Sequence, residues 1–175
     1  MELTTDEALM LKAIEEAKKC VSVETAYNVG AIITAPETKP TGDPKKPGTI
    51  IAKGFSRQHP GNTHAEECAL LNLSLAANTK LSVTQLRELD DCSNGFARGT
   101  TIYTTMEPCS KRLSGNRSCT SRLISSGVAR VVIGVKEPDK FVMCEGTSLL
   151  KAEGIKIDYI QNEAIIEACK NLNSV

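Results

Sequence analysis

The sequence predicts an α/β fold, a three-layer αβα sandwich built on a central mixed five-stranded sheet. Two apolar segments, residues 29–35 and 49–55, follow one another as the strands of a hairpin do, and helical and strand patterns alternate after them. The run Val131-Val132-Ile133 is continuously apolar, which is typical of a strand covered on both faces. A hairpin followed by such alternation gives a mixed sheet with helices on both of its faces.

The chain begins with a predicted helix over residues 4–20, in which Thr4 and Glu7 have the spacing of a capping box. The two apolar segments that follow are rich in isoleucine and valine, which favours strands. Residues 36–48 lie between them and hold four prolines and two glycines, so we expect a loop there. A second long polar loop is expected over residues 87–99.

The remaining elements alternate between the two types. Helical patterns, two of them followed by a glycine that favours the end of a helix, cover residues 64–77, 120–126, 147–153 and 162–172. Strand patterns cover residues 101–105, 129–135 and 155–160. With 175 residues, of which 41% are apolar and 24% charged, the chain is expected to form one globular domain over residues 1–175.

Composition also argues against several classes of function. Lys plus Arg and Asp plus Glu both number 21, aromatic residues make up 3%, and tryptophan is missing, so nucleic acid is not an expected partner. No apolar run is long enough for a membrane span, and the first residues lack the pattern of a signal peptide. Seven cysteines, an odd number, do not suggest a disulfide framework. We therefore expect a cytoplasmic protein that acts on a small molecule.

The most informative residues are His64, Cys109 and Cys119. One imidazole and two thiolates suit Zn²⁺ and leave its fourth position open, where a bound water becomes a nucleophile near neutral pH. His64 and Glu66 stand as His-Ala-Glu before a predicted helix, and Cys109 stands in Glu-Pro-Cys after a predicted strand. This is the signature of zinc deaminases, except that nine residues separate the two cysteines where the signature has two. One Zn²⁺ per chain is expected.

Glu66 is the expected catalytic residue, a carboxylate that takes a proton from the water and delivers it to a leaving amine. Cys68 is an alternative ligand in place of Cys119, because it lies four residues after His64 and would share its helical face. The other cysteines have no partner motif, so we expect buried or incidental thiols: Cys20, Cys92, Cys144 and Cys169.

These residues resemble the cytidine deaminase superfamily. The stretch from Tyr103 to Ser110 with Cys119 is similar to the diaminohydroxyphosphoribosylaminopyrimidine deaminases of riboflavin biosynthesis. Similarity extends to Asn28-Val29-Gly30-Ala31, to residues 54–66, to residues 126–134 and to Glu137-Pro138-Asp139. The resemblance implies a cytidine deaminase-like fold and an oligomer, which we expect to be a homodimer.

Two departures indicate the fungal type of this family. Residues 110–118 contain neither His nor Pro, and no residues remain for the reductase domain that bacterial members carry. The implied substrate is 2,5-diamino-6-ribitylamino-4(3H)-pyrimidinone 5′-phosphate, and the product is 5-amino-6-ribitylaminouracil 5′-phosphate. The alternatives are a deaminase of tRNA adenosine or of a free nucleoside, or a zinc module without catalysis. The sequence leaves the choice between a ribityl and a ribosyl substrate open.

The resemblance also implies residues that contact the substrate. Asn28 is expected at the ring or the sugar-like chain, and backbone N–H groups near Ala65 and Cys109 are expected at the carbonyl. A phosphate needs cations, and we expect Lys111 or Arg112 to anchor it. The full set of expected substrate contacts is Asn28, Arg57, His59, Ala65, Ser110, Lys111, Arg112 and Arg117.

Overall fold

The computed structural model describes residues 2–36, 48–77, 82, 84–85, 97–136 and 145–173. Most of the two long loops predicted over residues 36–48 and 87–99 lies outside these residues. So do Cys92, Cys144 and the tripeptide Glu137-Pro138-Asp139.

The described chain forms one five-stranded sheet with the strand order β2-β1-β3-β4-β5. The strands are β1 (Gly30–Thr34), β2 (Ile50–Phe55), β3 (Thr101–Met106), β4 (Arg130–Val135) and β5 (Lys156–Tyr159). Strand β1 pairs antiparallel with both β2 and β3, whereas β3 with β4 and β4 with β5 pair parallel. The predicted mixed sheet is confirmed.

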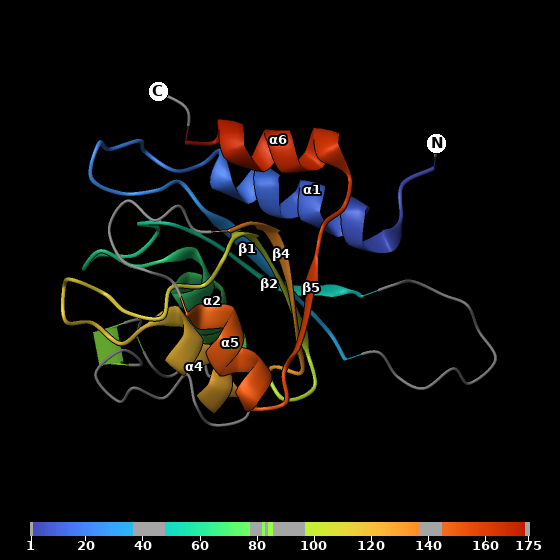
Figure 1. Ribbon diagram of the computed structural model, residues 1–175. Helices are drawn as coiled ribbons and strands as arrows, with labels where there is room; N and C mark the ends of the chain where they lie inside the picture. The colour runs from blue at the N-terminus through green and yellow to red at the C-terminus, as the bar shows by residue number, and fades with distance from the viewer. Residues whose placement is uncertain are drawn as a thin grey trace.

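Helices cover both faces of the sheet, which gives the predicted three layers (Figure 1). Helices α1 (Thr5–Ala17) and α6 (Glu163–Asn171) pack together on one face. The other face carries α2 (Ala65–Ala77), α4 (Cys119–Ser126) and α5 (Gly146–Ala152). Among the described residues, no helix has the length and apolar character needed to cross a bilayer.

Alternation along the central strands divides the apolar core into two halves. On β4, Val131 and Ile133 pack with residues of α2, α4 and α5, whereas Val132 between them packs with residues of α1 and α6. Strand β3 repeats the pattern with Ile102 and Tyr103. Successive side chains of a strand point to opposite faces, so a continuously apolar strand is what a doubly covered sheet requires.

The helix ends follow the chemistry expected of their residues. Thr4 and Glu7 form the capping box, because each backbone N–H donates to the other's side chain. Gly127 ends α4 in the left-handed conformation, which glycine adopts without steric cost. Helix α1 ends three residues before the predicted boundary, since the chain tightens there and the N–H of Cys20 bonds to the carbonyl of Ala17.

One edge of the sheet gathers the segments that carry the site. The carboxyl ends of β2 and β3 and the start of β1 meet there, because β1 runs antiparallel to both neighbours. Helix α2 can pack closely on β2 only because position 54 is a glycine. A Cβ at Gly54 would lie 2.6 Å from the carbonyl oxygen of Ala65, the first residue of α2. This close approach sets the position of the helix that follows His64.

We predict that Gly54→Ala lowers the free energy of unfolding by about 1–3 kcal/mol, the usual cost of forcing extra volume into a packed interface. Urea titration followed by circular dichroism measures the change. Ile51→Val, on the exposed side of the same strand, is the control and should change the free energy by less than about 0.5 kcal/mol. Equal effects of the two substitutions would contradict the close packing.

Candidate active site

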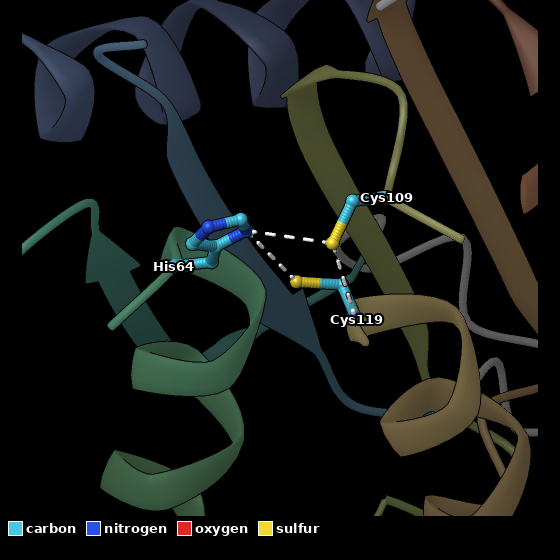
Figure 2. Close-up of side chains that lie close together, drawn as sticks. All are labelled: His64, Cys109 and Cys119. Atoms are coloured by element: carbon cyan, nitrogen blue, oxygen red, sulfur yellow. Dashed lines mark hydrogen bonds between the residues drawn. The ribbon is translucent and has the colours of Figure 1, made fainter. Parts of the chain in front are cut away.

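His64, Cys109 and Cys119 converge on one point (Figure 2). The Nδ1 atom of His64 lies 3.5 Å from the Sγ of Cys109 and 3.5 Å from the Sγ of Cys119. All three ligand atoms lie within 4.8 Å of one another. His64 directly precedes α2, Cys109 follows β3, and Cys119 is the first residue of α4. The expected meeting of strand ends and helix N-termini is therefore observed.

The electrostatics of the two thiols fit a cation. The hydrogen bond from Cys119, together with the nearby ring of His64, lowers the pKa of Cys109 to about 4. The pKa of Cys119 is raised, because this thiol bonds to Cys109, is fully buried and lies near Glu66. The two pKa shifts run in opposite directions, and a divalent cation among the three atoms would favour the deprotonated form of both thiols. One nitrogen and two sulfurs are a donor set that suits zinc.

Helix α4 adds to the stabilisation of negative charge at Cys109. The backbone N–H of Cys119 donates to Cys109 Sγ over 3.4 Å, and the N–H of Thr120 donates to the Cys109 carbonyl over 3.1 Å. The first N–H groups of a helix have no partner within the helix and carry partial positive charge. The Thr120 hydroxyl also donates to the carbonyl of Pro108 over 3.2 Å. These bonds fix the turn that delivers Cys109.

Cys68, the alternative ligand, lies outside the cluster. Among the described residues, the group of side chains able to hold a metal is His64, Cys109 and Cys119. Cys68 is fully buried on α2, and its pKa is raised chiefly by that burial. Its thiol interacts with Thr63 and with the backbone of residues 58 and 59, on the loop before the helix. Of the other cysteines in the described residues, Cys169 is buried and Cys20 half-buried.

Glu66 lies beside this cluster and is 3% exposed. Its Oε1 atom lies 3.0 Å from the hydroxyl of Thr104, which also lies 3.0 Å from the carbonyl oxygen of Met106. Burial raises the pKa of Glu66, which moves the carboxyl group toward the range in which it can both accept and donate a proton near neutral pH. Thr104 therefore holds the carboxyl group in place, a role that the sequence did not indicate.

A cavity of about 360 Å³ opens onto His64, Glu66 and Cys109. Of the expected substrate contacts, Arg57, Lys111 and Arg112 line it. Asn28, His59, Ala65, Ser110 and Arg117 are not among its lining residues. The sequence reasoning did not single out the other residues of the wall: Thr25, Ala26, Tyr27, Val29, Ser56, Asn62, Thr63, Met106, Glu107, Leu113 and Ser114. Val29, Ser56, Asn62, Thr63, Met106 and Glu107 lie in segments that the sequence analysis found similar to the deaminase family, but no role was assigned to them.

Arg57 lines the cavity and is hydrogen-bonded to Asn28, which does not line it. The guanidinium of Arg57 donates to the carbonyls of Tyr27 and Val21 over 3.0 and 2.9 Å and to Asn28 Oδ1. The Nδ2 atom of Asn28 donates to Leu172, and the backbone N–H and carbonyl of Asn28 bond to the side chain of Asn173. Asn28 thus joins the end of α6 to the wall, and its predicted contact with substrate stays a prediction.

The remaining expected contacts point to other partners. His59 Nε2 lies 3.0 Å from Asn72 Oδ1, and the Ser110 hydroxyl accepts from the N–H of Glu145 over 3.1 Å. Arg117 donates to Ser121 and Ser125 on α4. Arg112 is buried against Glu67, whereas Lys111 is exposed at the cavity. The predicted substrate contacts of His59, Ser110 and Arg117 stay predictions.

The site corresponds to a known family. A family model described as the cytidine and deoxycytidylate deaminase zinc-binding region matches residues 3–135, about three quarters of the chain. The chain belongs to this deaminase family.

The similar curated proteins include a named deaminase and a named riboflavin biosynthesis protein. The chain is 42% identical over 151 residues to the diaminohydroxyphosphoribosylamino-pyrimidine deaminase of Schizosaccharomyces pombe. It is 36% identical over 173 residues to the riboflavin biosynthesis protein RibD of a Synechocystis strain. The two matches cover 86% and 98% of this chain but 31% and 37% of the relatives. The chain therefore spans about a third of the length of these curated relatives.

Solved deaminases confirm the cytidine deaminase-like fold. The Rib2 deaminase of Aspergillus oryzae, as a C-terminal deletion mutant, matches with a TM-score of 0.70 and 30% identity, over 97% of this chain and 92% of that one. The same enzyme in complex with DARIPP matches with a TM-score of 0.68 and 28% identity, over 95% of this chain and 99% of that one.

We predict that Cys119→Ser removes most of the bound zinc, because a serine hydroxyl is a poor zinc ligand beside the remaining imidazole and thiolate. Elemental analysis after dialysis against a weak chelator measures the metal content. Cys68→Ser is the matched control and should keep its zinc. Loss of zinc from the Cys68 variant and not from the Cys119 variant would reverse the ligand assignment.

Proposed function

We propose that the chain is a zinc-dependent hydrolase of riboflavin biosynthesis that deaminates 2,5-diamino-6-ribitylamino-4(3H)-pyrimidinone 5′-phosphate. The products are 5-amino-6-ribitylaminouracil 5′-phosphate and ammonia. The observation that carries the proposal is the buried carboxyl group of Glu66 beside the cluster of His64, Cys109 and Cys119, at a cavity open to a small molecule. A purely structural zinc site favours four protein ligands and needs no such carboxylate.

His64, Cys109 and Cys119 would hold one Zn²⁺ beside the cavity, which His64 and Cys109 line. Zinc supplies a water molecule whose pKa is lowered toward neutrality. Glu66 takes a proton from this water as it attacks the ring carbon that bears the exocyclic amine. The same carboxyl group passes that proton to a ring nitrogen. It then takes the second proton from the hydroxyl group that has added to the ring carbon and gives it to the amine, which leaves as ammonia as the carbonyl forms. Backbone N–H groups near Ala65 and Cys109 are suited to hold the substrate carbonyl.

Two cations of the cavity are available for the phosphate of the substrate. Lys111 is exposed at the cavity. The three hydrogen bonds of Arg57 go to neutral acceptors, two carbonyls and an amide oxygen, so these partners leave its positive charge uncancelled. We assign the phosphate to Lys111 with support from Arg57. The guanidinium of Arg112 already faces Glu67.

The names of the relatives support this class of substrate, and the Aspergillus oryzae enzyme has been solved with DARIPP. Ammonia release from the ribityl phosphate, the ribosyl phosphate and cytidine, measured side by side, tests the substrate. Fastest turnover of the ribityl phosphate is expected. Preference for cytidine would favour a nucleoside deaminase, and no turnover of any of the three would favour a zinc module without catalysis.

We predict that Glu66→Gln lowers kcat by about 10²–10⁴-fold, the usual contribution of a general acid–base group. The amide keeps the size of the side chain but cannot shuttle a proton. Zinc content, measured on the same sample, should stay that of the parent protein, because Glu66 is not a ligand. Retained turnover in this variant would exclude the acid–base role.

We predict that Lys111→Ala raises KM for the phosphorylated substrate by about 10-fold or more, the effect of losing one charged hydrogen bond. KM for the dephosphorylated analogue should not change, since the phosphate contact is missing there in both proteins. Lys12→Ala on α1, which pairs with Glu15 on the opposite face of the sheet, is the control. A rise in KM for both substrates alike would contradict the assignment of Lys111.

The homodimer and the cytoplasmic location expected from the sequence stay predictions. Sedimentation at several protein concentrations tests the first, and fractionation of cells tests the second.

A further inference from the structure

The side chain of Arg112 is almost completely buried although it belongs to an irregular segment between two metal ligands. It is 2% exposed, and its Nη1 atom donates to Glu67 Oε2 over 2.9 Å. Nη1 also lies 3.5 Å from the carbonyl oxygen of Arg117, and Nη2 donates to the carbonyl of Asn62. A buried arginine of this kind is fixed in place, because the planar guanidinium has several donors in one rigid fork.

Arg112 and the residues whose carbonyls it contacts stand close in sequence to the three predicted ligands. Arg112 itself stands three residues after Cys109, Asn62 stands two residues before His64, and Arg117 stands two residues before Cys119. One guanidinium therefore joins the three separate chain segments that deliver the imidazole and the two sulfurs. A second hydrogen bond, from Asn116 Nδ2 to the carbonyl of Gly61 over 3.4 Å, also joins the segment between the two cysteines to the segment before His64.

Glu67 supplies the countercharge from α2, one residue after Glu66. Its carboxylate is fully buried and also receives Arg122 of α4, whose Nη2 atom lies 3.4 Å from Glu67 Oε1. The carboxylate thus ties the helix that follows His64 to the helix that begins with Cys119. A charge buried in this way is stable only with its partners in place, so the cluster admits few alternative arrangements.

We propose that Arg112, anchored on Glu67, is a positioning residue that holds the three metal ligands in their binding geometry before the metal arrives. The inference rests on the zinc site of the proposed function and goes beyond it. It assigns to Arg112 the preorganisation of the site, whereas Lys111 next to it faces the substrate. Groups that orient ligands from outside the coordination sphere typically change metal affinity by about 10–100-fold.

The test is the zinc dissociation constant of Arg112→Lys, measured by competition with a chromophoric chelator. Lysine keeps one positive charge for Glu67, but a single ammonium cannot reproduce the fork that spans both carbonyls. We expect zinc to bind about 10–100-fold more weakly, and the absorption bands of the Co²⁺-substituted protein to shift as the ligand geometry relaxes. Circular dichroism of the metal-free protein sets a temperature at which every variant is folded.

Arg117→Lys is the matched control, the same substitution in the same segment. Within the described residues, the side chain of Arg117 bonds to Ser121 and Ser125 in the segment of Cys119 and does not join that segment to those of His64 and Cys109, so the zinc affinity of this variant should remain that of the parent. Should Arg112→Lys not fold, Glu67→Gln, which removes the anchoring charge, is measured in its place with the same expectation.

Each other outcome overturns a defined claim. A parent protein that binds no zinc contradicts the proposed function and this inference with it. Tight zinc in the parent, with an unchanged dissociation constant in Arg112→Lys and only a lower melting temperature of the metal-free form, leaves the proposed function standing and reduces Arg112 to general stability. Equal weakening in Arg112→Lys and Arg117→Lys also overturns the inference.

Discussion

One imidazole nitrogen and two thiol sulfurs lie within 4.8 Å of one another. Cys109 stands 45 positions after His64, and Cys119 stands 10 positions after Cys109. Bringing these groups together is electrostatically unfavourable when both thiols are ionised. The hydrogen bond between the two thiols shifts their pKa values in opposite directions, down for Cys109 and up for Cys119, where burial adds to the rise, so a second thiolate is disfavoured here. The fold must therefore hold the three groups together, and a bound metal would then stabilise this geometry. The other features of the fold near this edge of the sheet help to hold the three groups in place.

The sheet and its helices position most of these groups. Parallel directions of β2 and β3 bring the segments of His64 and Cys109 to one edge, and Gly54 lets α2 approach the sheet closely enough to fix its first turn. The N-terminus of α4 directs two N–H groups at Cys109. Burial then acts on Glu66 in the same place, because the water-poor surroundings that strengthen the metal site also raise the pKa of this carboxyl group.

The sequence predicts a site residue when its motif is local, and fails when the residue's contacts come from distant parts of the chain. The sequence predicted that His64, Cys109 and Cys119 cluster with Glu66 beside them, since these residues stand in short motifs at strand and helix ends. The contacts of Arg112 and Asn28 could not be predicted, because their partners Glu67 and Asn173 come near only in the folded chain. Arg112 and Arg117 both lie between the two cysteines, and the sequence does not distinguish them. In the structure Arg112 bonds to the buried Glu67, whereas Arg117 bonds to Ser121 of α4. The same holds for Thr104, whose hydroxyl meets Glu66 only across β3 and α2.

X-ray absorption at the zinc edge of the metal-loaded protein tests the central claim most directly. A catalytic site with three protein ligands predicts two sulfurs at about 2.3 Å and two light atoms at about 2.0–2.1 Å, one from His64 and one from a water. Replacement of that water by a substrate analogue should change the light-atom shell and leave both sulfurs in place. A third sulfur, or a shell that no small molecule alters, would mean that the fourth position is closed and would contradict a hydrolytic zinc site.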